Sequence, residues 1–299
     1  MAVVAAAGAA CLFPDPPPLA DGGAGPDAGG DAAQADAGDA GDSGAACDPA
    51  KPFTSIAPIA ELDTGDVYKA SLSPDELEIW YGLTLHGDGG QTTNQIMHAT
   101  RASRAAPFGT PSVEANIAPG DVDPAVTDDT LTLYYSKFGT VGNWDLFWAT
   151  RLDRVSAFGI GAQLPGAIQS DGGETAAFVA FDGSLYFLSS RSGSNDVWRA
   201  ASQDGGFAAP ALVSSLSSPS NETGIVLTHD GLSAYVTSLR TDVGSAGGQD
   251  IFVARRATIT DDFGAPTNET ELNGASAERA NWISWDGCRL YCESTRNST

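Results

Sequence analysis

The sequence predicts an all-β fold made of repeated antiparallel hairpins. Its apolar residues fall in short alternating runs that are rich in aromatic residues, the pattern of half-buried strands, and no convincing amphipathic helix is present. Asp-centred turns separate pairs of these runs and recur about 50 residues apart, from Asp75 to Asp286. A unit of this length that holds several strands is typical of a propeller blade. The sequence therefore predicts a β-propeller of four-stranded antiparallel blades.

The chain begins with small apolar residues, 1–10, that end at Cys11. This run is too short to cross a bilayer. It resembles the end of a bacterial lipoprotein signal, in which small residues precede a Cys that becomes lipidated, although no Lys or Arg comes before it. We therefore expect residues 1–11 to be a signal-like segment with lipidation at Cys11. The alternative is an Ala-rich N-terminus with an incidental Cys.

Residues 12–50 form a low-complexity linker of Ala, Gly, Asp and Pro that contains no Lys or Arg. Such a segment buries too little apolar surface to offset the entropy lost on ordering. We expect a disordered acidic linker that holds the following domain away from a membrane.

Residues 51–299 contain five units with one plan, and we count five blades with room for an irregular sixth. Each unit has one strand before and one strand after its turn; the turn residues are Asp75, Asp129, Asp182, Asp230 and Asp286. A third strand aligns without gaps in four units, at 95–99, 145–149, 196–200 and 250–254. A Phe-Gly-x-Pro-like element, as at 263–266, is expected to form the outer strand, where Pro removes no ladder hydrogen bond.

The last unit, 277–299, contains an inner hairpin and then stops. Residues 53–58 have the pattern of an outer strand that lacks a unit of its own. We expect this N-terminal strand to close the last blade, because ring closure leaves no open sheet edge. The third strand of that blade is not recognisable at either end of the sequence.

The cysteines are Cys11, Cys47, Cys288 and Cys292. The last two lie on one strand, roughly 13 Å apart, which is too far for a mutual disulfide. Cys47 precedes the closing strand and Cys288 lies in the blade that this strand completes, so we predict a Cys47–Cys288 disulfide. The alternative is that these residues stay as thiols. The spacing does not suit a zinc site.

The units resemble the WD40-like (PD40) repeats of TolB-type β-propellers. The resemblance covers about 53–299 and is best in segments such as 185–191 and 250–254. Together with the lipoprotein-like start and the acidic linker, the arrangement resembles exported lipoproteins of the myxobacterial type. The resemblance implies a lipoprotein of the outer membrane that faces the periplasm or the cell surface. It says little about activity, because propellers include both binding proteins and enzymes.

The net charge of −23 argues against nucleic-acid binding and against docking on anionic lipid. Membrane contact is therefore expected only through a lipid anchor. The charge is consistent with simple solvation, with a basic partner or with cation binding.

An acid lies near the start of the inner strand in every unit. Equivalent positions on successive blades form a ring around the propeller axis, so these acids are a candidate binding site at one mouth of the channel. They are Asp66, Asp121, Glu174, Glu222 and Glu278. The alternative is that they are solvated strand starts in an acidic protein. The turn Asp residues need no such explanation, because hairpin turns favour Asp.

No catalytic set stands out: HExxH, phosphate-loop and G-x-S-x-G motifs are absent from the sequence. We expect no metal and no cofactor, with calcium as a weak alternative. The expected function is that of a monomeric module that binds a protein or peptide partner in the cell envelope. Two alternatives stay open: a propeller hydrolase or lyase acting on polysaccharide or peptide, and a cation-stabilised structural propeller.

Overall fold

The computed structural model describes residues 4–11, 53, 56–62, 65–139, 142–242 and 244–295, and for 4–11 it describes the backbone alone. Almost all regular structure in these residues is β-strand. The helical turns are the short 3-10 helices η1 (Ala60–Leu62), η2 (Asp88–Gly90) and η3 (Gly166–Ile168). Within the described part of the chain, no helix has the length and apolar character needed to cross a membrane.

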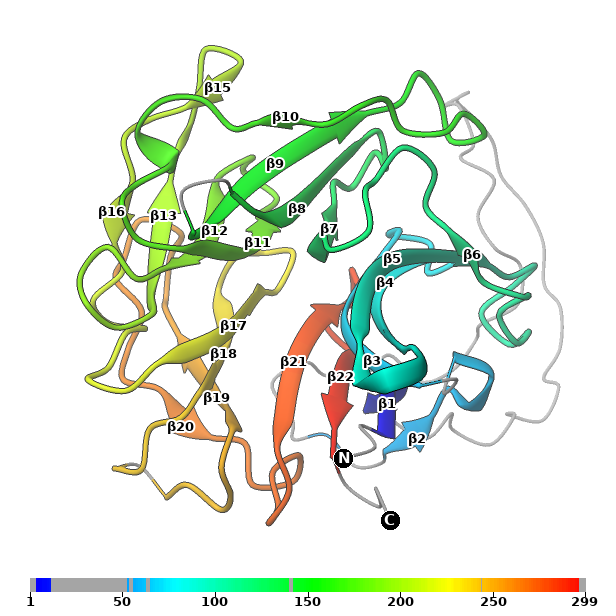
Figure 1. Cartoon of the computed structure of the whole chain (residues 1–299). Helices are drawn as coiled ribbons and strands as arrows, with labels where there is room; N and C mark the ends of the chain where they lie inside the picture. The colour runs from blue at the N-terminus through cyan, green and yellow to red at the C-terminus, as the bar shows by residue number, and fades with distance from the viewer. Residues whose placement is uncertain are drawn as a thin grey trace, which may run out of the picture.

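Four blades are each built from one continuous stretch of chain (Figure 1). The first two contain β3 (Asp66–Leu72), β4 (Glu78–His86), β5 (Thr92–Thr100) and β6 (Ser112–Val113), then β7 (Val122–Val126), β8 (Thr132–Phe138), β9 (Trp144–Thr150) and β10 (Ala162–Gln163). The next two contain β11 (Glu174–Val179), β12 (Leu185–Ser189), β13 (Asp196–Ala200) and β16 (Ala211–Leu212), then β17 (Glu222–Leu227), β18 (Ser233–Ser238), β19 (Asp250–Arg255) and β20 (Thr267–Asn268). A small hairpin of β14 (Ser202–Gln203) and β15 (Gly206–Phe207) precedes β16.

The first strand of each blade lies nearest the centre, and neighbouring first strands contact one another around the axis, in the order β3, β7, β11, β17. The fold is a β-propeller. The predicted third strands are confirmed in β5, β9, β13 and β19. The sequence predicted five blades with room for a sixth, whereas four blades are formed by continuous stretches of chain.

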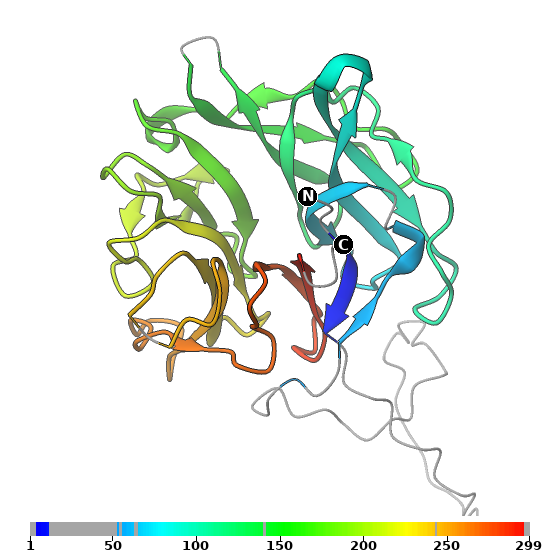
Figure 2. The same cartoon turned by 60° about the horizontal axis from the view of Figure 1, so that its bottom comes forward.

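A further four-stranded sheet joins the two ends of the described chain. Its order is β21 (Glu278–Ile283), β22 (Leu290–Ser294), β1 (Val4–Cys11) and β2 (Ala57–Pro58). Its inner strand β21 contacts both β17 and β3. Figures 1 and 2 both show the blue N-terminal strand beside the red C-terminal strands. Strand β1 of this sheet lies in the segment that we expected to be signal-like.

The outer strands differ from the prediction. They follow the Phe-Gly-x-Pro-like elements instead of containing them, as β20 follows 263–266. Two of the Phe side chains are buried beneath arginines, with the Arg101 guanidinium 4.5 Å from the Phe108 ring and Arg256 4.3 Å from Phe263. The element therefore packs an aromatic ring against the blade before the edge strand begins, and only the two residues after it pair with β19.

The Asp turns follow one design. In the third turn along the chain, Asp182 Oδ1 accepts a hydrogen bond from Ser184 N at 2.9 Å. In the next, Asp230 Oδ1 accepts from Thr228 Oγ1 at 2.6 Å and from Leu232 N at 2.9 Å. Because the Asp side chain closes the turn from within, it is engaged in structure, as the sequence predicted. The side chain of the residue before each turn Asp is not needed for these turn hydrogen bonds.

Candidate functional site

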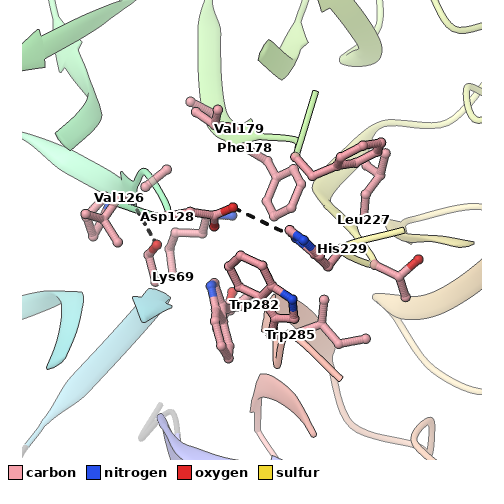
Figure 3. A pocket seen from close by; sticks show the side chains of 17 residues that line it. Lys69, Val126, Asp128, Phe178, Val179, Leu227, His229, Trp282 and Trp285 are labelled. Carbon is pink, nitrogen blue, oxygen red and sulfur yellow. Dashed lines mark hydrogen bonds and ion pairs between the residues drawn. The ribbon is translucent and has the colours of Figure 1, made fainter. Parts of the chain in front are cut away.

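A pocket opens at the end of the channel where the inner strands finish (Figure 3). Its walls come from β3, β7, β11, β17 and β21 and from the turns that follow β7, β11, β17 and β21. The acids predicted as a binding ring lie at the opposite ends of the same strands. A strand of six residues is about 20 Å long, so the acids and the pocket lie near opposite ends of the inner strands.

The rim of the pocket consists of residues that directly precede a turn Asp. We call them the mouth cluster; they are Asp128, Phe181, His229 and Trp285. The ring centroids of His229 and Trp285 are 3.6 Å apart, and those of Phe181 and His229 are 5.8 Å apart. The His229 Nδ1 atom lies 3.9 Å from Asp128 Oδ2, as the dashed line in Figure 3 marks. A carboxylate and an imidazole thus lie close together among aromatic rings.

The mouth cluster is open to solvent. Phe181 is 42% exposed and Trp285 is 50% exposed. Partial burial raises the pKa of the Asp128 carboxyl, although the nearby His229 opposes this shift. Half-exposed aromatic side chains around a concave opening are typical of binding sites, where a partner covers them.

The mouth cluster was not predictable from the residues that the repeats share. The turn Asp recurs, but the residue before it is Pro74, Asp128, Phe181, His229 or Trp285 in successive units. Variation at one position of an otherwise regular turn was the available signal.

The floor of the pocket carries Lys69 and Asn281, which we call the floor pair. Each sits at a β-bulge of its inner strand, Lys69 between Tyr68 and Ala70 and Asn281 between Ala280 and Trp282. Lys69 has a φ of 38°, a left-handed conformation that costs energy for a residue with a side chain. Bulges redirect side chains and occur often beside functional sites. Both side chains are almost fully buried.

A compact set of charges surrounds Lys69. The Arg279 guanidinium lies 3.5 Å from Asp123 Oδ1 and 3.6 Å from Glu293 Oε1. Burial, reinforced by the positive charge of Arg279, lowers the pKa of Lys69 to about 8, although Asp123 and Glu293 oppose the shift. Lys69 and Arg279 together balance the two carboxylates, so the floor is neutral when Lys69 is protonated.

The predicted acidic ring is not a set of open carboxylates. Glu174 is fully buried and accepts hydrogen bonds from Ser189 Oγ at 2.6 Å and Arg191 Nη2 at 3.2 Å. Glu222 is also fully buried and accepts from Ser238 Oγ at 3.0 Å and Arg240 Nη2 at 3.1 Å. Each carboxylate therefore links the inner strand of its own blade to the end of the second strand.

The other three acids vary this arrangement. Glu278 is buried and accepts from Gly274 N at 3.1 Å, and buried Asp121 lies 3.2 Å from Lys137 Nζ. Asp66 is partly exposed and lies 2.6 Å from His86 Nε2. The alternative expectation of solvated strand starts is wrong for the four buried acids. The binding ring stays a prediction, and these contacts favour a structural role.

Cys288 is disulfide-bonded, and its partner lies outside the described side chains. Cys292 is buried in β22. The predicted pairing with Cys47 and the predicted lipidation of Cys11 both concern side chains outside the described residues, so both stay predictions.

Two hydroxyl groups of the pocket have structural partners: Ser71 Oγ accepts from Val126 N at 3.0 Å, and Thr228 Oγ1 donates to Asp230 at 2.6 Å. Among the described residues, no group of three or more His, Cys, Asp or Glu side chains is arranged to hold a metal ion.

Comparison with protein-family models and with curated proteins gave no match. Among solved structures, the chain is similar to TolB from Acinetobacter baumannii, with 15% identity and a TM-score of 0.45 over 81% of this chain and 57% of that one. It is also similar to a puromycin-hydrolyzing peptidase of Mycobacterium tuberculosis, with 15% identity and a TM-score of 0.43 over 70% of this chain and 33% of that one. A third similar structure is the β-propeller domain of the Trilobed protease from Pyrococcus furiosus, with 11% identity and a TM-score of 0.36 over 64% of this chain and 55% of that one.

The chain thus spans between 33% and 57% of these three proteins. Two of these structures are described as TolB and as a β-propeller domain. The fold assigned to this chain rests on its own strand order.

Proposed function

We propose that this protein is a binding module that holds a peptide segment of a partner protein in the channel pocket. The observation that carries the proposal is the mouth cluster, in which half-exposed aromatic rings surround a concave opening and Asp128 lies close to His229. Aromatic side chains near the centre of an interface supply much of the binding free energy in protein–protein recognition. The neighbouring Asp128 and His229 offer polar contacts that fix orientation.

A peptide selection tests this proposal. Random heptapeptides are selected on the immobilised full chain, and the affinity of one selected peptide is then measured by calorimetry. Trp285→Ala is expected to weaken binding by about tenfold, because it removes a central aromatic contact. Trp148→Ala is the matched control, since Trp148 is a partly exposed tryptophan on β9 that does not line the pocket. Equal losses in both variants, or a selection without binders, would contradict the proposal.

We also propose that β1 and β2 complete a fifth blade and so close the ring. The support is the antiparallel pairing of Ala10 with both Tyr291 of β22 and Ala57 of β2. The competing proposal is export as a PD40-type lipoprotein of the envelope, anchored at Cys11 through the acidic linker. The two proposals compete because signal cleavage before Cys11 would remove most of β1. The intact mass of the protein from its native host decides: retention of residues 4–10 supports closure, and a lipid on an N-terminal Cys11 supports anchoring.

A further inference from the structure

The floor pair presents one buried donor and one buried acceptor to the pocket. We propose that Lys69 and Asn281 together recognise a carboxamide group, the side chain of Gln or Asn, on the bound peptide. This inference deepens the proposed function and rests on it, because it names the ligand group that the same pocket selects.

The first support is the hydrogen-bonding state of the floor pair. Lys69 Nζ and Asn281 Oδ1 are buried, and neither has a hydrogen-bond partner among the residues that the structure describes. Burying a polar group without a partner costs free energy, so such groups are rare in folded proteins and point to a missing ligand or solvent contact. Here two of them, of opposite hydrogen-bonding character, line one pocket.

Glu293 holds the floor pair together. Its Oε2 atom accepts a hydrogen bond from the backbone N of Lys69 at 2.7 Å and from Asn281 Nδ2 at 3.4 Å. Because a carboxylate only accepts, the Asn281 amide must direct its nitrogen toward Glu293, which leaves Oδ1 as the atom without a partner. The contact therefore fixes which end of the amide can serve a ligand.

The charge balance of the floor selects a neutral ligand group. Lys69 and Arg279 already offset Asp123 and Glu293, so a carboxylate would leave one buried negative charge and an ammonium one buried positive charge. The net charge of −23 further disfavours an acidic ligand. A carboxamide preserves the balance, and it carries both an acceptor for Lys69 and a donor for Asn281.

The pocket also provides a place for the rest of such a side chain. The rings of Phe178 and Trp282 line the same pocket as Lys69 (Figure 3). They offer an apolar contact for the methylene groups that precede the amide of Gln. The carbonyl oxygen would accept from Lys69 Nζ, and the amide N–H would donate to Asn281 Oδ1.

The test compares ligands that differ in one group. Three pools of heptapeptides have Gln, Glu or Leu at the central position and the same random mixture on both sides. Each pool is immobilised, and binding of the full chain is measured by interferometry. The Gln pool is expected to bind at least about tenfold more tightly than the Glu and Leu pools, since only Gln satisfies both floor groups without adding charge. This comparison uses the unaltered protein and does not depend on any variant folding.

Variants then assign the preference to the floor pair. Lys69→Met and Asn281→Leu are each expected to reduce the preference for the Gln pool over the Leu pool, because each removes one of the two floor groups, whereas Trp285→Ala weakens all pools by a similar factor and keeps the preference. If wild-type protein binds the Glu or Leu pool as tightly as the Gln pool, or if both floor variants keep the preference, the inference is overturned and the binding function stands. If no pool binds, both the inference and the proposed function fail.

Discussion

Replacement of Lys69 by Met is expected to stabilise the protein at neutral pH. Lys69 is 1% exposed, and its pKa is lowered from 10.5 to about 8, with burial as the largest cause. A shift of this size corresponds to about 3 kcal/mol of free energy that the folded state loses by holding the charge. This net figure already includes the attraction of Asp123 and Glu293. Met has a similar shape without the charge, so the gain is up to about 3 kcal/mol, less any packing defect.

The lowered pKa of Lys69 determines how the stability difference between the two proteins changes with pH. Below pH 8 the folded and unfolded states both carry the Lys69 proton, so the full penalty is present. Between pH 8 and 10.5 the unfolded state binds more protons than the folded state, and wild-type stability rises with pH. The advantage of Lys69→Met should therefore be largest near pH 7 and should vanish as the pH approaches 10.5.

Urea unfolding of both proteins at pH 7 and pH 10 measures this difference. Lys137→Met is a control of opposite sign, because it leaves the buried carboxylate of Asp121 without the ammonium that lies 3.2 Å away. A Lys69→Met protein that is less stable than wild type at pH 7, or a gain that does not change with pH, would refute the reasoning. A confirmed gain would show that the chain keeps a destabilising group in its pocket, as functional sites often do.

Three further outcomes are expected. Glu222→Ala should lower the free energy of unfolding by about 3 kcal/mol in urea, because it leaves Arg240 buried without its carboxylate, and it should not change peptide affinity. Burial opposes ionisation of Glu78, but the nearby His98 and the hydrogen bond from Arg154 hold its pKa at about 2. Acid titration should therefore show stability lost from about pH 4.5 downward, and less steeply in Glu78→Gln. Reduction of the Cys288 disulfide should lower the free energy of unfolding by about 2–4 kcal/mol, and non-reducing peptide mapping should join Cys288 to Cys47.

The blade plan was predictable because it depends on local chemistry. An Asp that closes a hairpin turn acts within a few residues of itself, so its recurrence identified the turns from Asp75 to Asp286. The aligned third strands followed from alternation in the same way. The Phe-Gly-x-Pro-like elements were assigned to the wrong role, because their Phe rings pack on arginines that lie in the preceding loop.

The site was harder to predict because it depends on contacts between distant segments. The acid at Glu174 looked solvated in the sequence, yet Ser189 and Arg191 enclose it after the chain turns back. Lys69 and Asn281 lie near opposite ends of the described sequence, and Glu293 connects them by accepting a hydrogen bond from each. Strand β1 lacked a recognisable pattern, since its small residues show no alternation.

The location of a bound peptide tests the central claim most directly. A selected heptapeptide with a benzophenone side chain is irradiated with the full chain, and the cross-linked residues are identified by mass spectrometry. We predict cross-links within 178–181, 227–229 and 282–285, at the mouth where the inner strands end. Cross-links that fall instead beside Glu174, Glu222 and Glu278 would place the ligand at the opposite mouth and contradict the account.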